Sequence, residues 1–238
     1  ESRQDELAEY ALVLLADGMG GYEAGEVAAA LAIEAMRNYL LQQKLFATLA
    51  GGSSTLPGPF DVAICRQHLL AALREANRQV YEASRNAAGR RGMGCTGEVV
   101  YVDGHYLVIG HVGDSRTYHL HQGRLIQVTR DHTLVSRLLE LGQLTPEEAD
   151  AHPRRSELQQ ALGGRAEVEP ELYDRKLLPG DWIVVCSDGL SNQIKPAELQ
   201  EMLQSEAMSA EMAARRLVNL ANLRGALDNV TIVVIRAT

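Results

Sequence analysis

The chain has 238 residues, of which 46% are hydrophobic and 23% charged, a balance typical of one globular domain with a sizeable core. Its 31 acidic residues outnumber 23 lysines and arginines, and the formal net charge of -8 argues against non-specific binding to nucleic acid or to an anionic membrane surface. No apolar run in the sequence approaches the length of a membrane span, so we expect no membrane partner.

The cysteines and the first residues indicate the compartment and the context of the chain. Three cysteines lie far apart and form no Cys-x-x-Cys motif, so we expect them to be reduced and the protein to be cytoplasmic. The opening segment, Glu1-Ser2-Arg3-Gln4-Asp5, is neither a signal peptide nor a natural start with Met. We therefore expect the chain to be a piece of a longer protein.

The first half of the chain is predicted to hold one strand, two long helices and a β-meander. The apolar run Ala11-Leu12-Val13-Leu14-Leu15-Ala16 is typical of a buried strand. Helical spacing of apolar residues predicts helices over about 23–44 and 61–86, separated by a loop rich in Gly, Ser and Pro. The period then changes to two, and four short strands are expected at 98–102, 106–111, 115–120 and 125–128.

The second half of the chain is predicted to contain both helices and strands. Thr145-Pro146-Glu147-Glu148 is a capping box, which predicts a short helix within a largely helical excursion from Thr133 to Gly164. A strand (182–187), two helices (196–204 and 209–223) and a closing strand (231–235) follow. This order does not alternate as βαβ units do, so we predict a single α+β domain over 1–238, with antiparallel sheets and antiparallel helices packed outside them.

Four aspartates stand at predicted strand ends beside glycine or asparagine. Asp17, Asp114 and Asp188 each follow an apolar strand, whereas Asp228 precedes the closing strand. Taken singly, each is more readily a turn residue, and Asp17-Gly18 alone could form a hairpin. Because antiparallel neighbours bring one strand's end beside the next strand's start, Asp188 and Asp228 should meet, with Asp17 nearby.

Carboxylates packed so closely stay ionised only when a cation compensates them. Oxygen ligands without a His or Cys cluster select hard divalent ions, which predicts Mg²⁺ or Mn²⁺. The glycine after Asp17 would let a backbone carbonyl, that of Gly18, turn towards the metal. A carboxylate that bridges two ions is the geometry of two-metal hydrolysis at phosphorus.

Five motifs in order resemble those of the bacterial type 2C (PPM) metal-dependent protein phosphatases. They are Asp17-Gly18-Met19-Gly20-Gly21, Gly113-Asp114-Ser115-Arg116, Asp131-His132-Thr133, Ser187-Asp188-Gly189 and Asp228-Asn229-Val230-Thr231. The resemblance extends from Asp5 to the C-terminus. It implies a central β-sandwich of two antiparallel sheets flanked by helix pairs, and hydrolysis of phosphoserine and phosphothreonine in proteins.

The resemblance also implies a role for each matching residue. Asp17 resembles the bridging ligand of two metal ions, and the Gly18 carbonyl a ligand of the first. Asp188 and Asp228 resemble ligands of the second ion, and Asp114 with Asp188 matches a third-metal position. Asp5 matches an acidic residue that holds metal-bound water.

Two further expectations come from the resemblance. The segment 133–164 corresponds to a flap beside the site that is thought to affect substrate choice. The family's phosphate-binding arginine would fall just before residue 1, and Met19 stands where some members have a histidine proposed as general acid.

The hypothesis is direct hydrolysis by a metal-bridged water without a phosphoenzyme, in a monomer whose substrates are phosphoproteins and include a cognate serine/threonine kinase. One alternative is a pseudophosphatase that binds a phosphoprotein or kinase without turnover. A second is a hydrolase of small phosphoesters or nucleic acid, and the net charge disfavours nucleic acid.

Other polar residues have simpler interpretations. We expect His132 to be a hydrogen-bonded turn residue and Arg116 an ion-pair partner of a nearby acid. His119 and His121 alternate on one strand face, and we interpret their setting as a solvated sheet edge rather than a metal site.

Overall fold

The structure is a computed structural model. It describes residues 10–20, 22–43, 60–86, 92–205, 208–226 and 228–238. Two four-stranded antiparallel sheets form its centre. The first runs in the order β1-β4-β5-β8 and the second in the order β10-β9-β6-β7. The bounds in the first sheet are Tyr10–Leu15 (β1), Gly97–Asp103 (β4), Tyr106–Val112 (β5) and Glu171–Lys176 (β8). Those in the second are Arg116–His121 (β6), Arg124–Gln127 (β7), Trp182–Cys186 (β9) and Ile232–Arg236 (β10).

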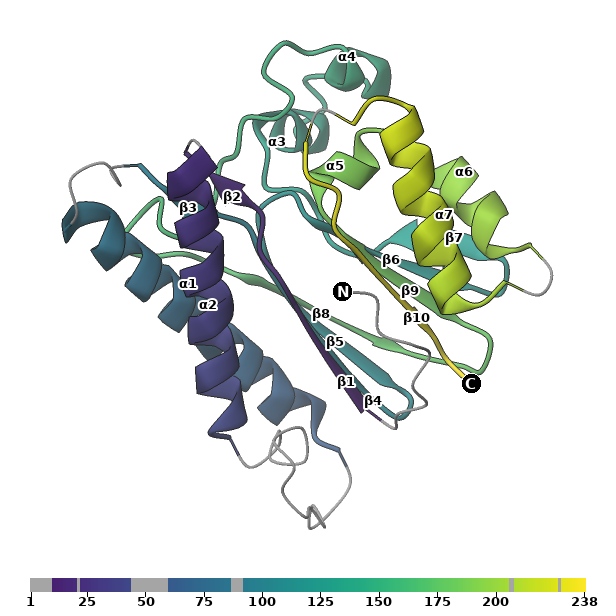
Figure 1. Cartoon of the computed structure of the whole chain (residues 1–238), viewed down its shortest axis with the longest axis horizontal. Coiled ribbons are helices and arrows are strands. Elements are labelled where there is room, and N and C mark those ends of the chain that lie inside the picture. The colour runs from purple at the N-terminus through teal and green to yellow at the C-terminus, as the bar shows by residue number, and fades with distance from the viewer. Residues whose placement is uncertain (1–9, 21, 44–59, 87–91, 206–207, 227) are drawn as a thin grey trace.

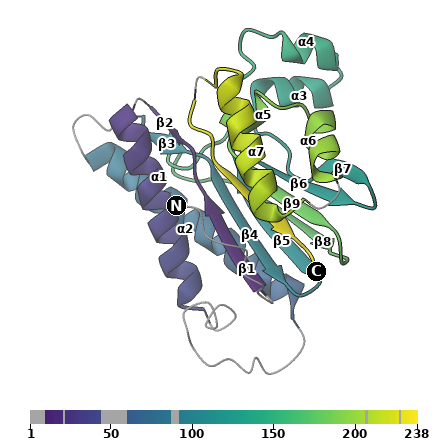
Figure 2. The same ribbon diagram turned by 45° about the vertical axis from the view of Figure 1, so that its right-hand side comes forward.

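Helices cover the outer face of each sheet. Figure 1 shows α1 and α2 against the first sheet, and α5, α6 and α7 beside the second. Their bounds are Tyr22–Leu41 (α1), Val62–Asn86 (α2), Asp188–Ser191 (α5), Pro196–Leu203 (α6) and Ala210–Leu223 (α7). Figure 2 shows the same layers after rotation, with the sheets between the two groups of helices. The predicted α+β class and the sandwich implied by the resemblance are confirmed.

Each layer boundary has its own apolar core. One cluster joins α1 and α2 to the first sheet and includes the fully buried Leu69 and Leu73. A second lies between the sheets and includes Ile109 and Val185. A third lies between the second sheet and its helices and includes Leu217. Burial of both faces explains why β4, β5 and β9 read as nearly continuous apolar runs rather than alternating ones.

One strand was missed, and one expectation about the chain was wrong in part. The edge strand β8 was not predicted, because its sequence Glu-Leu-Tyr-Asp-Arg-Lys is mostly polar and only its pairing with β5 makes it a strand. The excursion over 133–164 is less helical than expected. Only α3 (Leu134–Glu140) and α4 (Pro146–Asp150) are helical there, and turns form most of the rest.

A short two-stranded ribbon continues from β1 and β4 of the first sheet towards the start of α1. It pairs β2 (Gly18–Met19) with β3 (Gly94–Cys95) in antiparallel register. Among the helices of the described ranges, none has both the length and the apolarity needed to cross a bilayer.

The packing of α2 gives a test of the core. Leu73→Ala should lower the free energy of unfolding by about 2–5 kcal/mol, because it opens a cavity where Leu73 is now fully buried. Chemical denaturation with urea measures this loss. The matched control is Leu223→Ala at the end of α7, where the residue is 85% exposed and the change should stay within about 0.5 kcal/mol. Equal losses in the two variants would contradict this core assignment.

Candidate active site

The structure brings together four aspartates that lie far apart in the sequence. Asp17 lies two residues after β1, and Asp188 begins α5 just after β9. Asp228 precedes β10, whose Ile232 pairs with Cys186 at the end of β9. The carboxylates of Asp188, Asp228 and Asp114 all act electrostatically on Asp17. The expected meeting of Asp188 and Asp228 at one sheet edge, with Asp17 nearby, is therefore what the fold produces.

Burial and mutual repulsion make the carboxyls of Asp17, Asp114 and Asp188 hard to ionise in the metal-free chain. Burial, together with the charges of Asp188 and Asp228, raises the pKa of Asp17 to about 7. Burial and the neighbouring Asp188 and Asp131 likewise raise the pKa of Asp114 to about 7. The pKa of Asp188 is also raised, by burial and by Asp228.

One oxygen of the cluster lacks a partner. Asp188 Oδ1 is buried and makes no hydrogen bond within the described part of the chain, while its Oδ2 accepts a hydrogen bond from Asn192 Nδ2 at 3.2 Å. A buried carboxylate oxygen without a donor is stabilised by a cation. The oxygen-only set of Asp17, Asp114, Asp188 and Asp228 thus fits hard divalent ions such as Mn²⁺ or Mg²⁺.

Thr96 fixes the backbone of Asp17. The Asp17 N–H donates to Thr96 Oγ1 at 2.9 Å, and the Thr96 N–H donates to the Asp17 carbonyl at 2.8 Å. Thr96 Oγ1 also lies 2.8 Å from Ser115 Oγ, next to Asp114. One buried hydroxyl therefore links the segments that carry two of the four aspartates.

Ser187 links the segments that carry the other two aspartates, Asp188 and Asp228. Its hydroxyl donates to the Asn229 carbonyl at 3.2 Å and accepts a hydrogen bond from the Thr231 N–H at 3.1 Å. These contacts hold the residue before Asp188 against the segment that follows Asp228. The two carboxylates are thus positioned through paired backbone as well as through their own side chains.

Two glycines allow the close backbone approaches at the site. A Cβ on Gly18 would lie 2.2 Å from the Gly25 carbonyl oxygen of α1. A Cβ on Gly189 would lie 2.3 Å from the Asn229 carbonyl oxygen. Both distances are far below van der Waals contact, so any side chain at either position would force the backbones apart. The role of the Gly18 carbonyl as a metal ligand stays a prediction, and the close approach to Gly25 is a separate, steric reason for glycine at this position.

The interpretations of His132 and Arg116 are confirmed. The Gly113 N–H donates to His132 Nδ1 at 3.2 Å, and the His132 N–H donates to the Gly113 carbonyl at 2.7 Å, so His132 holds the turn before Asp114. Burial and the neighbouring His111 lower the pKa of His132 to about 4. Arg116 Nη2 donates to Asp131 Oδ2 at 2.6 Å.

A buried polar network continues below this turn. His111 Nδ1 lies 2.6 Å from Glu98 Oε2, and the Thr117 hydroxyl donates to the other oxygen of Glu98. Burial lowers the pKa of His111, but the Glu98 carboxylate outweighs it and the net direction is upward. The network joins β4, β5 and β6, and so ties the two sheets together beneath Asp114.

A cleft of about 860 Å³ reaches Met19, which follows Asp17 by two residues in the chain. Arg74 and Asn77 of α2 line one side of it, and residues of the segment 158–169 line the other. The Asn77 side chain holds that segment, since its Nδ2 donates to the Arg165 and Ala166 carbonyls at 3.1 Å.

Comparison with known proteins identifies this arrangement. The profile of the family described as protein phosphatase 2C matches residues 1–227. The chain belongs to the protein phosphatase 2C family. Among its relatives is the Mycobacterium tuberculosis serine/threonine protein phosphatase PstP, 40% identical over 223 residues, which are 94% of this chain and 40% of that protein. Protein phosphatase PhpP of Streptococcus pneumoniae is 33% identical over 225 residues, 94% of this chain and 85% of that protein.

Solved structures of protein phosphatase 2C relatives share the fold. The S. agalactiae serine/threonine phosphatase superposes with a TM-score of 0.82 and 34% identity, over 96% of this chain and 88% of that one. The catalytic domain of PstP, solved in complex with two manganese ions, gives 0.76 and 36% over 95% and 90%. The resemblance drawn from the five motifs is therefore confirmed at the level of the family.

One expected site residue lies outside the described residues, and the roles of others were not predicted from the sequence. Asp5, expected to hold metal-bound water, lies outside the described residues. The roles of Thr96 and Ser187 were missed, although Ser187 stands in a quoted motif directly before Asp188, and a hydroxyl at that place was the available signal. His119 was expected at a solvated edge, but it is 3% exposed and lies between the sheets, so that interpretation is wrong.

The carboxylate cluster predicts a pH-dependent stability in EDTA. The unfolded Asp17 carboxyl ionises near 3.8, whereas the folded one keeps its proton until about 7. The folded state binds more protons within this window, so stability should fall as the pH rises from about 4 to about 7. Asp17→Asn should flatten the decline and raise the melting temperature at pH 8, as measured by calorimetry. Asp150→Asn, at a carboxylate that is 75% exposed, is the control and should follow the wild type. Identical slopes for wild type and Asp17→Asn would refute the repulsion.

The approach of Gly189 to Asn229 predicts a second effect. Gly189→Ala should weaken Mn²⁺ binding about 10–100-fold, because the added methyl group separates Asp188 from the Asp228 segment. Titration calorimetry measures the affinity, and circular dichroism checks that the fold is kept. Wild-type affinity in a folded variant would show that this approach does not position the ligands.

Proposed function

We propose that this chain hydrolyses phosphoserine and phosphothreonine in proteins, with two divalent ions, Mn²⁺ or Mg²⁺, at the aspartate cluster. The observation that carries the proposal is the convergence of Asp17, Asp188 and Asp228 at one partly buried place, within a chain of the protein phosphatase 2C family. The relatives PstP and PhpP are named as protein phosphatases, and the PstP catalytic domain holds two manganese ions.

The ligand assignment is the one that the resemblance implies, and the effects of these carboxylates on one another's pKa values support it. Asp17, whose pKa responds to both Asp188 and Asp228, would bridge the two ions, with the Gly18 carbonyl on the first. Asp188 and Asp228 would hold the second. Asp114 responds to Asp188 as well and would complete a third position with it. When bound, such ions supply charge neutralisation at the phosphoryl group and a water nucleophile at neutral pH.

The chain's own residues prepare this chemistry. Thr96 and Ser187 hold the backbones on either side of the cluster, so the carboxylates need little rearrangement when cations arrive. His132 fixes the turn that carries Asp114. Because the carboxyl groups repel one another in the metal-free chain, part of the ion-binding energy comes from relief of that repulsion.

The cleft beside Met19 is the proposed path of the phosphoprotein segment. Met19, two residues after Asp17 in the chain, lines it, and so do two cationic side chains, Arg74 and Arg165. Residues 158–161 and 164 of the proposed flap form part of its wall, which supports a role for the flap in substrate choice. Asn77 limits the movement of the adjoining segment through three hydrogen bonds.

The finer expectations stay proposals. The substrates would include a cognate serine/threonine kinase, and the protein would act as a monomer. A cytoplasmic location is supported by Cys65, Cys95 and Cys186, which are all buried with free thiols.

Phosphate release from a phosphothreonine peptide tests the function directly. Activity should require Mn²⁺ or Mg²⁺ and disappear in EDTA. Asp17→Ala should lower kcat by at least about 10²–10³, because it removes the proposed bridging ligand. Asp150→Asn is the control and should keep wild-type activity, since this exposed carboxylate lies in α4.

The outcomes separate the proposal from its rivals. Activity that persists in EDTA would contradict the two-metal assignment. Near-full activity in Asp17→Ala would show that another group binds the ions. A metal-loaded wild type that binds the peptide without releasing phosphate would favour the pseudophosphatase.

A further inference from the structure

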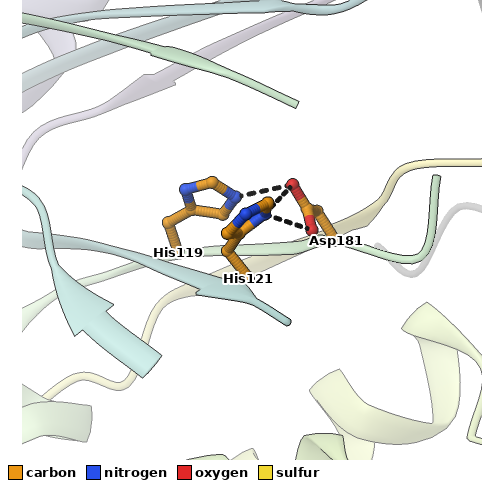
Figure 3. Close-up of side chains that lie close together, drawn as sticks. All are labelled: His119, His121 and Asp181. Carbon is orange, nitrogen blue, oxygen red and sulfur yellow. Dashed lines mark hydrogen bonds and ion pairs between the residues drawn. The ribbon is translucent and has the colours of Figure 1, made fainter. Parts of the chain in front are cut away.

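Two histidines and one aspartate meet beside the start of β9 (Figure 3). Asp188 of the aspartate cluster follows the other end of that strand. His119 and His121 come from β6, and Asp181 lies in the turn before β9. His119 Nε2 lies 2.9 Å from Asp181 Oδ2, and His121 Nδ1 lies 3.0 Å from Asp181 Oδ1. One ligand atom from each side chain lies within 4.8 Å of the other two.

Strand pairing fixes this arrangement. β6 pairs with β9 so that His119 lies opposite Ile183 and Leu120 opposite Trp182. One step further along this register, His121 faces Asp181. Because side chains alternate along a strand, His119 and His121 share one face, the face on which Ile183 joins the core between the sheets.

The cluster is separate from the aspartate site. Asp181 precedes β9 and Asp188 follows it, so the whole strand lies between them. Five strand residues span about 16 Å, which is too far for one ion to contact both places. The residues of this second cluster therefore have no part in the proposed hydrolysis.

The donor atoms favour a different metal from that of the aspartate cluster. Two imidazoles and one carboxylate are typical ligands of Zn²⁺, whereas Mg²⁺ and Ca²⁺ prefer oxygen alone. Zn–N and Zn–O distances near 2 Å place tetrahedral ligands about 3.3 Å apart. The 2.9 and 3.0 Å between the histidine nitrogens and the Asp181 oxygens therefore need to widen only slightly. The side chain of His121 is 37% exposed, which leaves a path for the ion and for a water as fourth ligand.

The protons can be accounted for without any added group. In the hydrogen-bonded form His119 Nε2–H and His121 Nδ1–H donate to Asp181. His119 Nδ1 is buried and makes no hydrogen bond within the described ranges. When Nε2 gives its lone pair to a metal, the ring proton moves from Nε2 to Nδ1, and the ring stays neutral. His121 can make the same exchange through its exposed Nε2.

Asp181 is already prepared as an anion. Burial raises the pKa of Asp181, but hydrogen bonds from the Leu178 N–H and from the two histidines outweigh this, and the pKa lies below its usual range. Its turn is also fixed to the end of the chain, because the Ala237 N–H donates to the Asp181 carbonyl at 2.8 Å.

We propose that His119, His121 and Asp181 form a Zn²⁺ site that joins the β6–β7 hairpin to the turn before β9 and, through that turn, to the segment after β10. The ion stabilises this end of the second sheet and takes no part in hydrolysis. Since Zn²⁺ binds the folded chain, a concentration 100-fold above its Kd should raise the melting temperature by about 5–10 °C.

The test uses the full chain, stripped of metal and kept in excess Mg²⁺ so that the aspartate cluster is occupied by its preferred ion. Titration calorimetry with ZnCl₂ should show one tight site in the wild type. Co²⁺ should give the visible absorption of a tetrahedral centre. His121→Gln removes the imidazole but keeps an amide that can donate to Asp181, so it separates a metal site from a hydrogen-bonded strut.

The expected results differ among the variants. His121→Gln and Asp181→Asn should bind Zn²⁺ at least about 100-fold more weakly and lose both the thermal shift and the Co²⁺ absorption. His105→Ala is the matched control, because His105 is an exposed histidine in the β4–β5 turn, and it should behave as the wild type. A wild type without tight Zn²⁺ binding, or wild-type binding in His121→Gln, would overturn the proposal. If His121→Gln does not fold, Asp181→Asn decides by the same readouts.

Discussion

Repulsion among partly buried carboxylates is the constraint on which this structure depends. Asp17, Asp114 and Asp188 are drawn from water and face one another, and all three resist ionisation as a result. Such an arrangement opposes folding at neutral pH, so the rest of the chain must hold it in place. The apolar clusters on both faces of each sheet supply that stability without contributing any group to the site.

The sandwich explains how residues so distant in sequence converge. Antiparallel pairing sets the end of β9 beside the start of β10, which brings Asp188 near Asp228. The pairing of Leu15 with Glu98 then sets Asp17 beside Thr96, and Thr96 contacts Ser115 of the β5–β6 turn. Each carboxylate is thus positioned by a backbone register, and a one-residue slip in any of these pairs would move its aspartate away from the others.

The sequence predicted the parts of this design that have a strong local signal. Apolar runs indicated β1, β5 and β9, and the glycines after Asp17 and Asp188 marked the places where these chains turn. The edge strand β8 could not be found in this way, since its polar residues form a strand only because β5 offers unpaired backbone groups. Thr96 and Ser187 were missed because a hydroxyl has no periodic signature, and their partners are 79 and 42 residues away.

His119 shows a different limit of sequence reasoning. Alternation along β6 correctly places His119 and His121 on one face, but it cannot say whether that face meets water or a second sheet. The answer depends on the packing of β6 against strands of the other sheet, which no local pattern encodes. In the folded chain His119 is buried beside Asp181, and its imidazole makes a hydrogen bond with the Asp181 carboxylate. The two ends of β9 therefore differ in chemistry. Other carboxylates gather near Asp188, whereas imidazole nitrogens face Asp181, and this difference in metal-ligating groups is what would let each end select its own metal ion.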